Sequence, residues 1–150
     1  MIFPKIAVYR ALLAGHPDDA MRIMEAAVAE EGRQNQKWMG SITANAAGRS
    51  LFMKMFKVGV QKLFGEKAGF RQENYRAGKG FVCMDIVQCP YYSHCLSEGV
   101  PELAHTFCDS DDYNYGHLPG IRFQRSGTLA RGNDRCDFHI DELSGDSSNA

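Results

Sequence analysis

Cys108 and Asp111 lie three residues apart in a segment whose pattern predicts a helix from Pro101 to about Tyr115. Helical positions separated by four, seven and eleven residues share a face, so both side chains would lie on the face that also carries Ala104. A carboxylate one turn from a thiol can orient a cationic substrate or act as a general base. Acidic residues near a helix C-terminus oppose the helix dipole, which favours this functional interpretation. The alternative is that these acids are simply solvated.

Cys89 is the best single candidate for a reactive thiol. It precedes Pro90, and proline suits the first turn of a helix, which would make Cys89 the N-cap. Unpaired backbone N–H groups and the positive end of the helix dipole stabilise a thiolate there, so the position predicts a lowered pKa. The alternative is a small buried side chain that closes the preceding strand.

Cys136 falls on the last predicted strand, 135–140. Because side chains alternate along a strand, Cys136 would share the core side with Phe138, whereas Asp137 would point to the other side. Pattern alone favours a packing role for this thiol. The neighbouring predicted strand, 121–130, has a polar face that is either solvated or lines a pocket. That face consists of Arg122, Gln124, Ser126 and Thr128.

Metal and nucleotide sites are disfavoured by the spacing of the candidate ligands. Cys89 and Cys95 are six residues apart, and the chain has no C-x-x-C pair and no histidine pair at ligand spacing. Phosphate-loop, G-x-S-x-G and H-E-x-x-H motifs are also missing from the sequence. We therefore expect no metal and no other cofactor.

The elements that must position these residues predict an α+β fold in one domain. N-terminal helices would pack on a small antiparallel sheet formed in the C-terminal half. Apolar spacing predicts helices that begin near 17, 49, 90 and 101, and strands over 80–88, 121–130 and 135–140. The chain divides into a helical part, a motif-bearing α+β part and a frayed tail, which cover 1–78, 79–141 and 142–150.

Composition narrows the class of protein. The chain has 150 residues, 44% of them hydrophobic, and a net charge of −1, but no apolar run long enough to span a membrane. The basic run between 49 and 79 has its phenylalanines at core spacing, so we expect no nucleic-acid partner. Five cysteines, an odd number, and a start unlike a signal peptide predict a cytoplasmic protein with reduced thiols. A small-molecule substrate is the expected partner, and the oligomeric state stays open.

An ordered set of short motifs resembles the L-2-amino-thiazoline-4-carboxylic acid hydrolase family over the last third to half of the chain. The matching residues are Cys89, Cys108, Asp111, Gly132, Cys136, Asp137 and Phe138. The resemblance implies a hydrolase that opens a cyclic isothiourea ring to N-carbamoyl-cysteine, by attack of a thiolate or of water on the amidine carbon. The N-terminal half shows no matching motif and is interpreted as a variable cap.

The resemblance also implies roles for individual residues. Cys108 or Cys89 would be the nucleophile, with Cys136 in the same catalytic group, and Asp111 would pair with the amidinium of the substrate. Arg125 or Arg122 would receive the substrate carboxylate. The other substrate-binding residues would be Tyr91, Thr128 and Asp137. The alternative function is a non-catalytic small-molecule-binding or redox-sensing thiol module.

Overall fold

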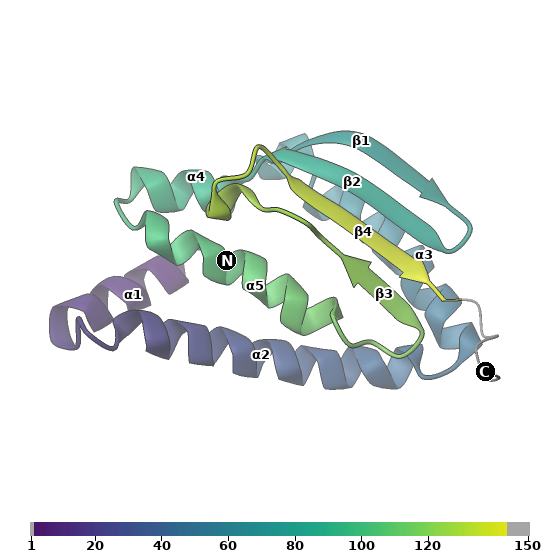
Figure 1. Cartoon of the computed structure of the whole chain (residues 1–150), viewed down its shortest axis with the longest axis horizontal. Coiled ribbons are helices and arrows are strands. Elements are labelled where there is room, and N and C mark those ends of the chain that lie inside the picture. Colours follow the sequence, from purple (N-terminus) through teal and green to yellow (C-terminus); the bar gives the residue numbers. More distant parts are fainter. Residues whose placement is uncertain (1, 144–150) are drawn as a thin grey trace.

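A computed structural model describes residues 2–143 and has the α+β architecture expected from the sequence (Figure 1). Three long helices come first in the chain. Two shorter helices follow the second strand in sequence and precede the third, and all four strands form one sheet. The helices are α1 (Phe3–Gly15), α2 (Ala20–Thr43), α3 (Ala46–Leu63), α4 (Pro90–Ser97) and α5 (Ala104–Tyr115). The strands are β1 (Arg71–Gly78), β2 (Phe81–Gln88), β3 (Ile121–Gln124) and β4 (Cys136–Glu142). Short 3-10 turns are η1 (Glu66–Ala68), η2 (Pro101–Leu103) and η3 (Leu129–Arg131).

All neighbouring strands of the sheet are antiparallel, in the order β1-β2-β4-β3. The last strand of the chain, β4, therefore lies in the interior of the sheet. Its register places Cys136 opposite Ile86 and Phe138 opposite Met84. This pairing fixes the thiol of Cys136 at one end of the sheet, beside the start of α4.

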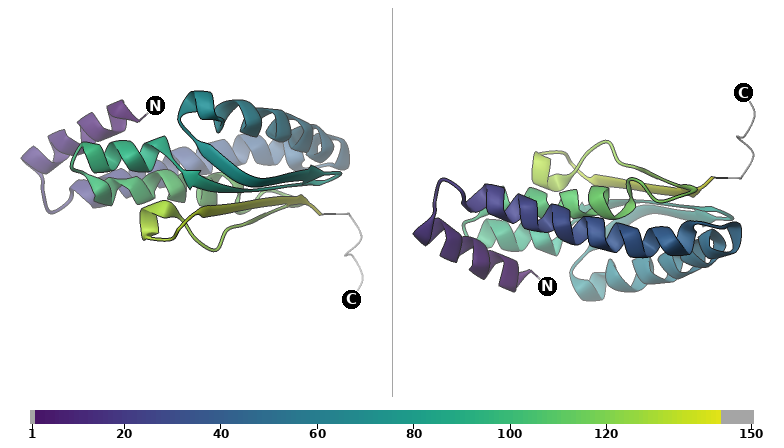
Figure 2. Two further views of the ribbon diagram at one scale, coloured as in Figure 1. Left: turned by 90° about the horizontal axis from the view of Figure 1, so that it is seen from above. Right: turned by 90° about the horizontal axis from the view of Figure 1, so that it is seen from below.

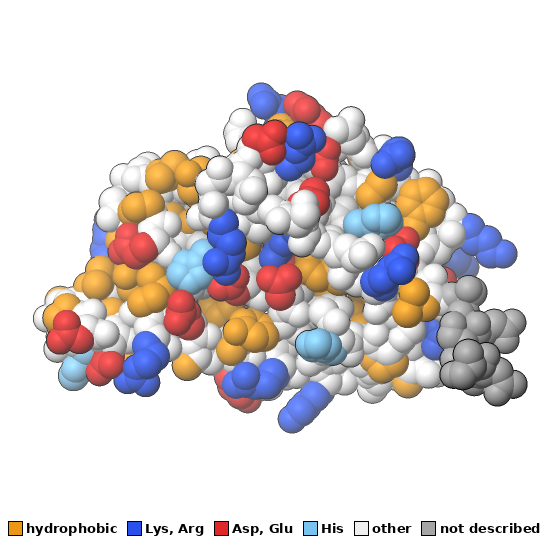
Figure 3. Space-filling model, viewed as in Figure 1, with side chains coloured by type: hydrophobic (Ala, Val, Ile, Leu, Met, Phe, Trp, Pro, Cys, Tyr) orange, Lys and Arg blue, Asp and Glu red, His pale blue; other side chains and the backbone are white. Residues whose placement is uncertain are grey.

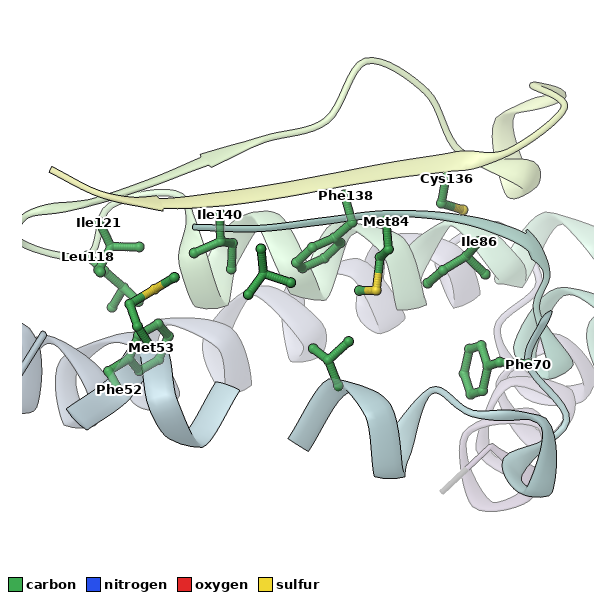
Figure 4. Packing of buried hydrophobic residues seen from close by; sticks show 12 residues of the cluster. Phe52, Met53, Phe70, Met84, Ile86, Leu118, Ile121, Cys136, Phe138 and Ile140 are labelled. Atoms are coloured by element: carbon green, nitrogen blue, oxygen red, sulfur yellow. The ribbon is translucent and has the colours of Figure 1, made fainter. Parts of the chain in front are cut away.

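One face of the sheet packs against α3, and the opposite face is turned to the viewer in Figure 1. Alternation along the strands produces this division, because every second residue of β2 and β4 is buried. Figure 4 shows Met84, Phe138 and Ile140 pointing from the sheet towards α3, with Cys136 on the same side. The predicted facing of Cys136 and Phe138 is thus confirmed.

A second hydrophobic cluster joins the N-terminal helices to α4 and α5. Ile6 and Tyr9 of α1 are buried in it, together with Cys95 and Leu103. Helices α2 and α5 approach closely at Gly32, where an added Cβ would come within 2.3 Å of the Tyr113 Cβ. Only glycine permits this spacing, so α2 sets the position of α5.

Three expectations from the sequence need correction. Strand β1 lies inside the part expected to be helical, 1–78; it is a largely exposed edge strand, so it lacks the apolar alternation that would reveal it. The strand expected over 121–130 ends at Gln124, because η3 and irregular loops occupy much of 125–135. The tail expected over 142–150 begins too early, because Glu142 is the last residue of β4. Positions 144–150 of the expected frayed tail lie outside the described residues.

The outer surface mixes both signs of charge with apolar side chains on the face seen in Figure 3. None of the helices within residues 2–143 is both long enough and apolar enough to cross a membrane. These features agree with the composition of the chain, which has 17 basic and 18 acidic residues.

Candidate active site

A cavity of about 370 Å³ gathers most of the candidate residues, and we call it the thiol cavity. Cys89, Cys108, Cys136 and Asp111 line it, although they come from the start of α4, from α5 and from β4. The whole predicted α5 face, Ala104 to Tyr115 at helical spacing, also lines it. Its volume falls in the range of small-molecule sites, roughly 300 to 1,000 Å³.

Cys108 and Cys136 interact through their thiols in this cavity. The hydrogen bond between them raises the pKa of Cys108 and lowers that of Cys136, so Cys136 ionises more readily than Cys108. The backbone N–H of Leu129 also donates to Cys136 Sγ at 3.3 Å. A hydrogen bond from a backbone N–H stabilises a thiolate. Of the two thiols, Cys136 is therefore the one that ionises more readily.

Cys89 is the N-cap of α4, with Pro90 in the first turn, as the sequence predicted. The prediction that its pKa is lowered is wrong, however. Burial raises the pKa of Cys89, and this effect outweighs the hydrogen bonds from the backbone N–H groups of Tyr92 and Tyr91. The nearby Cys108 and Asp111 add to the rise. The cap geometry was predictable from Pro90, whereas the apolar surroundings depend on tertiary packing.

Asp111 is the carboxyl group of the thiol cavity. Burial raises its pKa to about 7, even though the guanidinium of Arg125 opposes the rise. Arg125 Nη1 donates to Asp111 Oδ2 at 3.2 Å, and the described side chains make no hydrogen bond to Oδ1. The side chain keeps 29% of its accessible surface. A carboxyl with a pKa near neutrality is suited to gaining and losing a proton during a reaction.

Arg125 is occupied by the protein itself. Its side chain is 6% exposed, and it donates to Asp111, to Asp112 Oδ2 at 2.6 Å and to the carbonyl oxygen of Cys108 at 3.0 Å. Two carboxylates thus face one guanidinium. The expected role of Arg125 as receptor for a substrate carboxylate does not fit this arrangement, because a further anion there would meet two acidic groups. Arg122 is paired with Asp141.

The other three expected substrate-binding residues divide into one inside the cavity and two outside it. Tyr91 lines the thiol cavity and stacks on Phe107, with ring centroids 5.1 Å apart. Thr128 is buried and does not line the cavity, and its hydroxyl makes no hydrogen bond within the described residues. Asp137 lies in a separate groove on the opposite face of the sheet.

Asp137 has a structural role that its position on the outer face makes clear. It accepts hydrogen bonds from the backbone N–H groups of Ser126 and Gly127 and from the Ser126 hydroxyl. Burial raises its pKa, but these donors outweigh burial and lower it below the usual value. Asp137 therefore anchors the loop after β3. This loop leads to Leu129, whose backbone N–H donates to Cys136 Sγ.

Comparison with known proteins matches residues 1–140 to the family model described as L-2-amino-thiazoline-4-carboxylic acid hydrolase. The chain belongs to this family. A search of curated proteins finds no significant match. The similarity to the family extends well beyond the motifs of the C-terminal half, because the matched residues include α1, α2 and α3.

Sequence reasoning missed the contribution of these N-terminal helices to the cavity of this hydrolase-family protein. Lys5 of α1 and Glu31 of α2 line it and form an ion pair at 3.0 Å. No local motif marks either residue, since each faces the cavity only through helix packing. Among residues 2–143, no group of three or more histidine, cysteine or acidic side chains is arranged to hold a metal ion.

Proposed function

We propose that the thiol cavity hydrolyses a small cyclic isothiourea that carries a carboxylate, such as L-2-amino-thiazoline-4-carboxylic acid. The observation that carries the proposal is the convergence of an ionisable thiol pair and a carboxyl of raised pKa on one cavity. Family membership supports the substrate class. The product would be N-carbamoyl-cysteine, formed when the bond between the ring sulfur and the amidine carbon breaks.

Cys136 is the proposed nucleophile, because the Leu129 N–H and the Cys108 thiol both stabilise its thiolate. Asp111, in its ionised form, would pair with the amidinium N–H groups and hold the carbon against the sulfur. Attack forms a bond between Cys136 Sγ and the amidine carbon. The ring sulfur then leaves as a thiolate, which opens the ring and leaves a thiouronium on Cys136.

Water completes the reaction by attacking the same carbon. One proton of the water passes to Asp111, which releases it to solvent, and the other reaches the sulfur that left the ring. Collapse of the adduct breaks the bond to Cys136 Sγ and restores the thiolate. The oxygen of water becomes the carbonyl oxygen of the product, so one water is consumed and one proton is released.

A second candidate function is a redox-sensing thiol module, and the contact between Cys108 and Cys136 favours it. Two adjacent thiols can form a disulfide when the thiolate of one attacks a peroxide to give a sulfenic acid, and the second thiol then displaces water from the oxidised sulfur. The hydrolase proposal instead requires both thiols reduced, which places the enzyme in a reducing compartment such as the cytoplasm. The five cysteines are unpaired in the structure.

Turnover of the thiazoline substrate tests the proposal directly. The substrate has no thiol and the product has one, so a colorimetric thiol reagent measures the rate against an enzyme blank. We expect catalysis by the reduced protein and loss of activity after alkylation of its thiols. Absence of turnover by the reduced protein, together with reversible disulfide formation between Cys108 and Cys136, would favour the redox module.

A further inference from the structure

Lys5 lies at the entrance of the thiol cavity on a firmly anchored helix. Its neighbours in α1, Ile6 and Tyr9, are 2% and 3% exposed. Tyr9 also donates a hydrogen bond to Glu102 at 3.0 Å, which ties α1 to the turn before α5. The position of the Lys5 backbone is therefore set by packing that does not involve its own side chain.

The charge balance of the cavity singles out this lysine. Among the described lining residues, the cationic side chains are Lys5 and Arg125. Arg125 already faces the carboxylates of Asp111 and Asp112. Lys5 has one carboxylate partner, Glu31, whose side chain is 60% exposed. An ammonium group has three N–H donors, so two remain for a ligand when one is used by Glu31.

We propose that Lys5 receives the carboxylate of the substrate, and that Glu31 holds the ammonium group at the cavity entrance until the substrate arrives. This inference rests on the proposed function and adds the residue that selects anionic substrates. The Lys5 ammonium also lies 5.6 Å from the centre of the Phe107 ring, which stacks on Tyr91. A planar ring held along these aromatic side chains would carry its carboxylate towards Lys5.

Opposite effects of two substitutions distinguish a receptor from a structural ion pair. Lys5→Met keeps the length of the side chain over Phe107 but removes the charge, whereas Glu31→Gln removes the competing carboxylate and leaves the ammonium free. If the ion pair were only structural, both variants would behave alike. If Lys5 receives the carboxylate, KM should rise in Lys5→Met and fall in Glu31→Gln, with kcat little changed in either.

The experiment measures two ligands so that binding and chemistry are separated. Steady-state rates use the thiazoline carboxylate, and calorimetric affinities use the aromatic thiazole analogue as its carboxylate and as its neutral carboxamide. We expect Lys5→Met to reduce the preference for carboxylate over carboxamide by about 10- to 100-fold, the range for a hydrogen bond to a charged group. Lys5→Arg should restore most of that preference.

Each outcome decides between the two proposals. A preference unchanged in Lys5→Met, or KM raised equally in both variants, would overturn the role of Lys5 while leaving the hydrolase proposal intact. Binding that follows the expected pattern without turnover by the wild-type protein would retain Lys5 as the carboxylate receptor and reject the hydrolysis. Failure of the wild-type protein to bind the thiazole carboxylate would reject the role of Lys5 in substrate recognition.

Discussion

The backbone N–H of Leu129 donates to Cys136 Sγ at 3.3 Å, across seven residues of sequence. Leu129 holds this position because Asp137, next to Cys136 on β4, anchors the preceding loop through Ser126 and Gly127. Adjacent residues of one strand thus serve opposite faces of the sheet. One supplies the thiol, and the other fixes the loop that stabilises its charge.

Replacement of the thiols should rank them by role. We expect Cys136→Ala to lower kcat for the thiazoline substrate by about 10³-fold or more, since the covalent step is lost. Cys108→Ala should cost roughly 10- to 100-fold, because the thiolate loses one donor. Cys83 lies in the same sheet with its side chain on the other face, so Cys83→Ala is the matched control and should stay near the wild-type rate.

The ranking has two informative alternatives. A larger loss in Cys108→Ala than in Cys136→Ala would transfer the nucleophilic role to Cys108. Rates near that of the wild type in both variants would end the covalent mechanism and leave water as the attacking group, with Asp111 as its base.

Thiolate titration by ultraviolet absorbance should detect one thiol with a lowered pKa, which ionises before the other thiols as the pH rises. This signal should vanish in Cys136→Ala. It should move to higher pH in Cys108→Ala, because the hydrogen bond from Cys108 is the main cause of the lowered pKa of Cys136. An unchanged titration in Cys108→Ala would show that the two thiols do not share a proton in solution.

Activity should rise with pH as Asp111 ionises. Its pKa of about 7 predicts that kcat/KM increases through neutral pH, since the ionised form pairs with the amidinium and later accepts a proton from water. Asp111→Asn should remove this titration and lower kcat/KM by about 10²-fold or more. A pH profile that Asp111→Asn leaves unchanged would assign the titration to the thiol pair instead.

Stability should follow the opposite trend. Folding raises the pKa of Asp111 above the unfolded value of about 3.8, so the folded protein keeps a proton that the unfolded chain releases. This contribution is fully present below about pH 4 and is lost as the pH rises through about 7. Asp111→Asn should therefore gain roughly 1 to 3 kcal/mol relative to the wild type when urea unfolding at about pH 8 is compared with that at about pH 5. Equal differences at both pH values would contradict the raised pKa.

The close contact of α2 and α5 can be tested at Gly32. Gly32→Ala should lower the free energy of unfolding by about 1 to 3 kcal/mol, because the new methyl group meets Tyr113. Gly59→Ala in α3 is the control, since an added Cβ there meets nothing within 4 Å. It should stabilise the protein by up to about 1 kcal/mol through helix propensity. A Gly32→Ala variant as stable as the wild type would show that the helices can separate at little cost.

The residues whose positions the sequence predicted well are those governed by local periodicity. Helical spacing placed Cys108 and Asp111 on one face, and strand alternation placed Cys136 with the core. The environment of Cys89 was not predictable, because burial by distant residues overrides its helix cap. Strand alternation also placed Asp137 opposite Cys136, and the structure confirms this. Its expected role in substrate binding came from the motif match alone, and a matched motif gives no information about which face of the sheet the cavity occupies.

Two further elements escaped prediction because their signals are not local. Strand β1 is an edge strand with a bulge and a positive φ at Asn74, so it has neither a continuous apolar pattern nor regular pairing. Lys5 and Glu31 face the cavity only once α1 and α2 have packed beside α5. In contrast, the α+β class was predictable, because the apolar residues change from helical spacing to strand spacing near residue 78.

The interior position of β4 makes assembly of this site a late folding event. Cys108 is synthesised well before its partner, but the two thiols cannot meet until β4 has entered between β2 and β3. That insertion joins strands far apart in sequence, a kind of contact that forms slowly during folding. Partly folded chains would therefore expose isolated thiols of ordinary acidity, and the reactive thiolate would arise only in molecules whose sheet is complete.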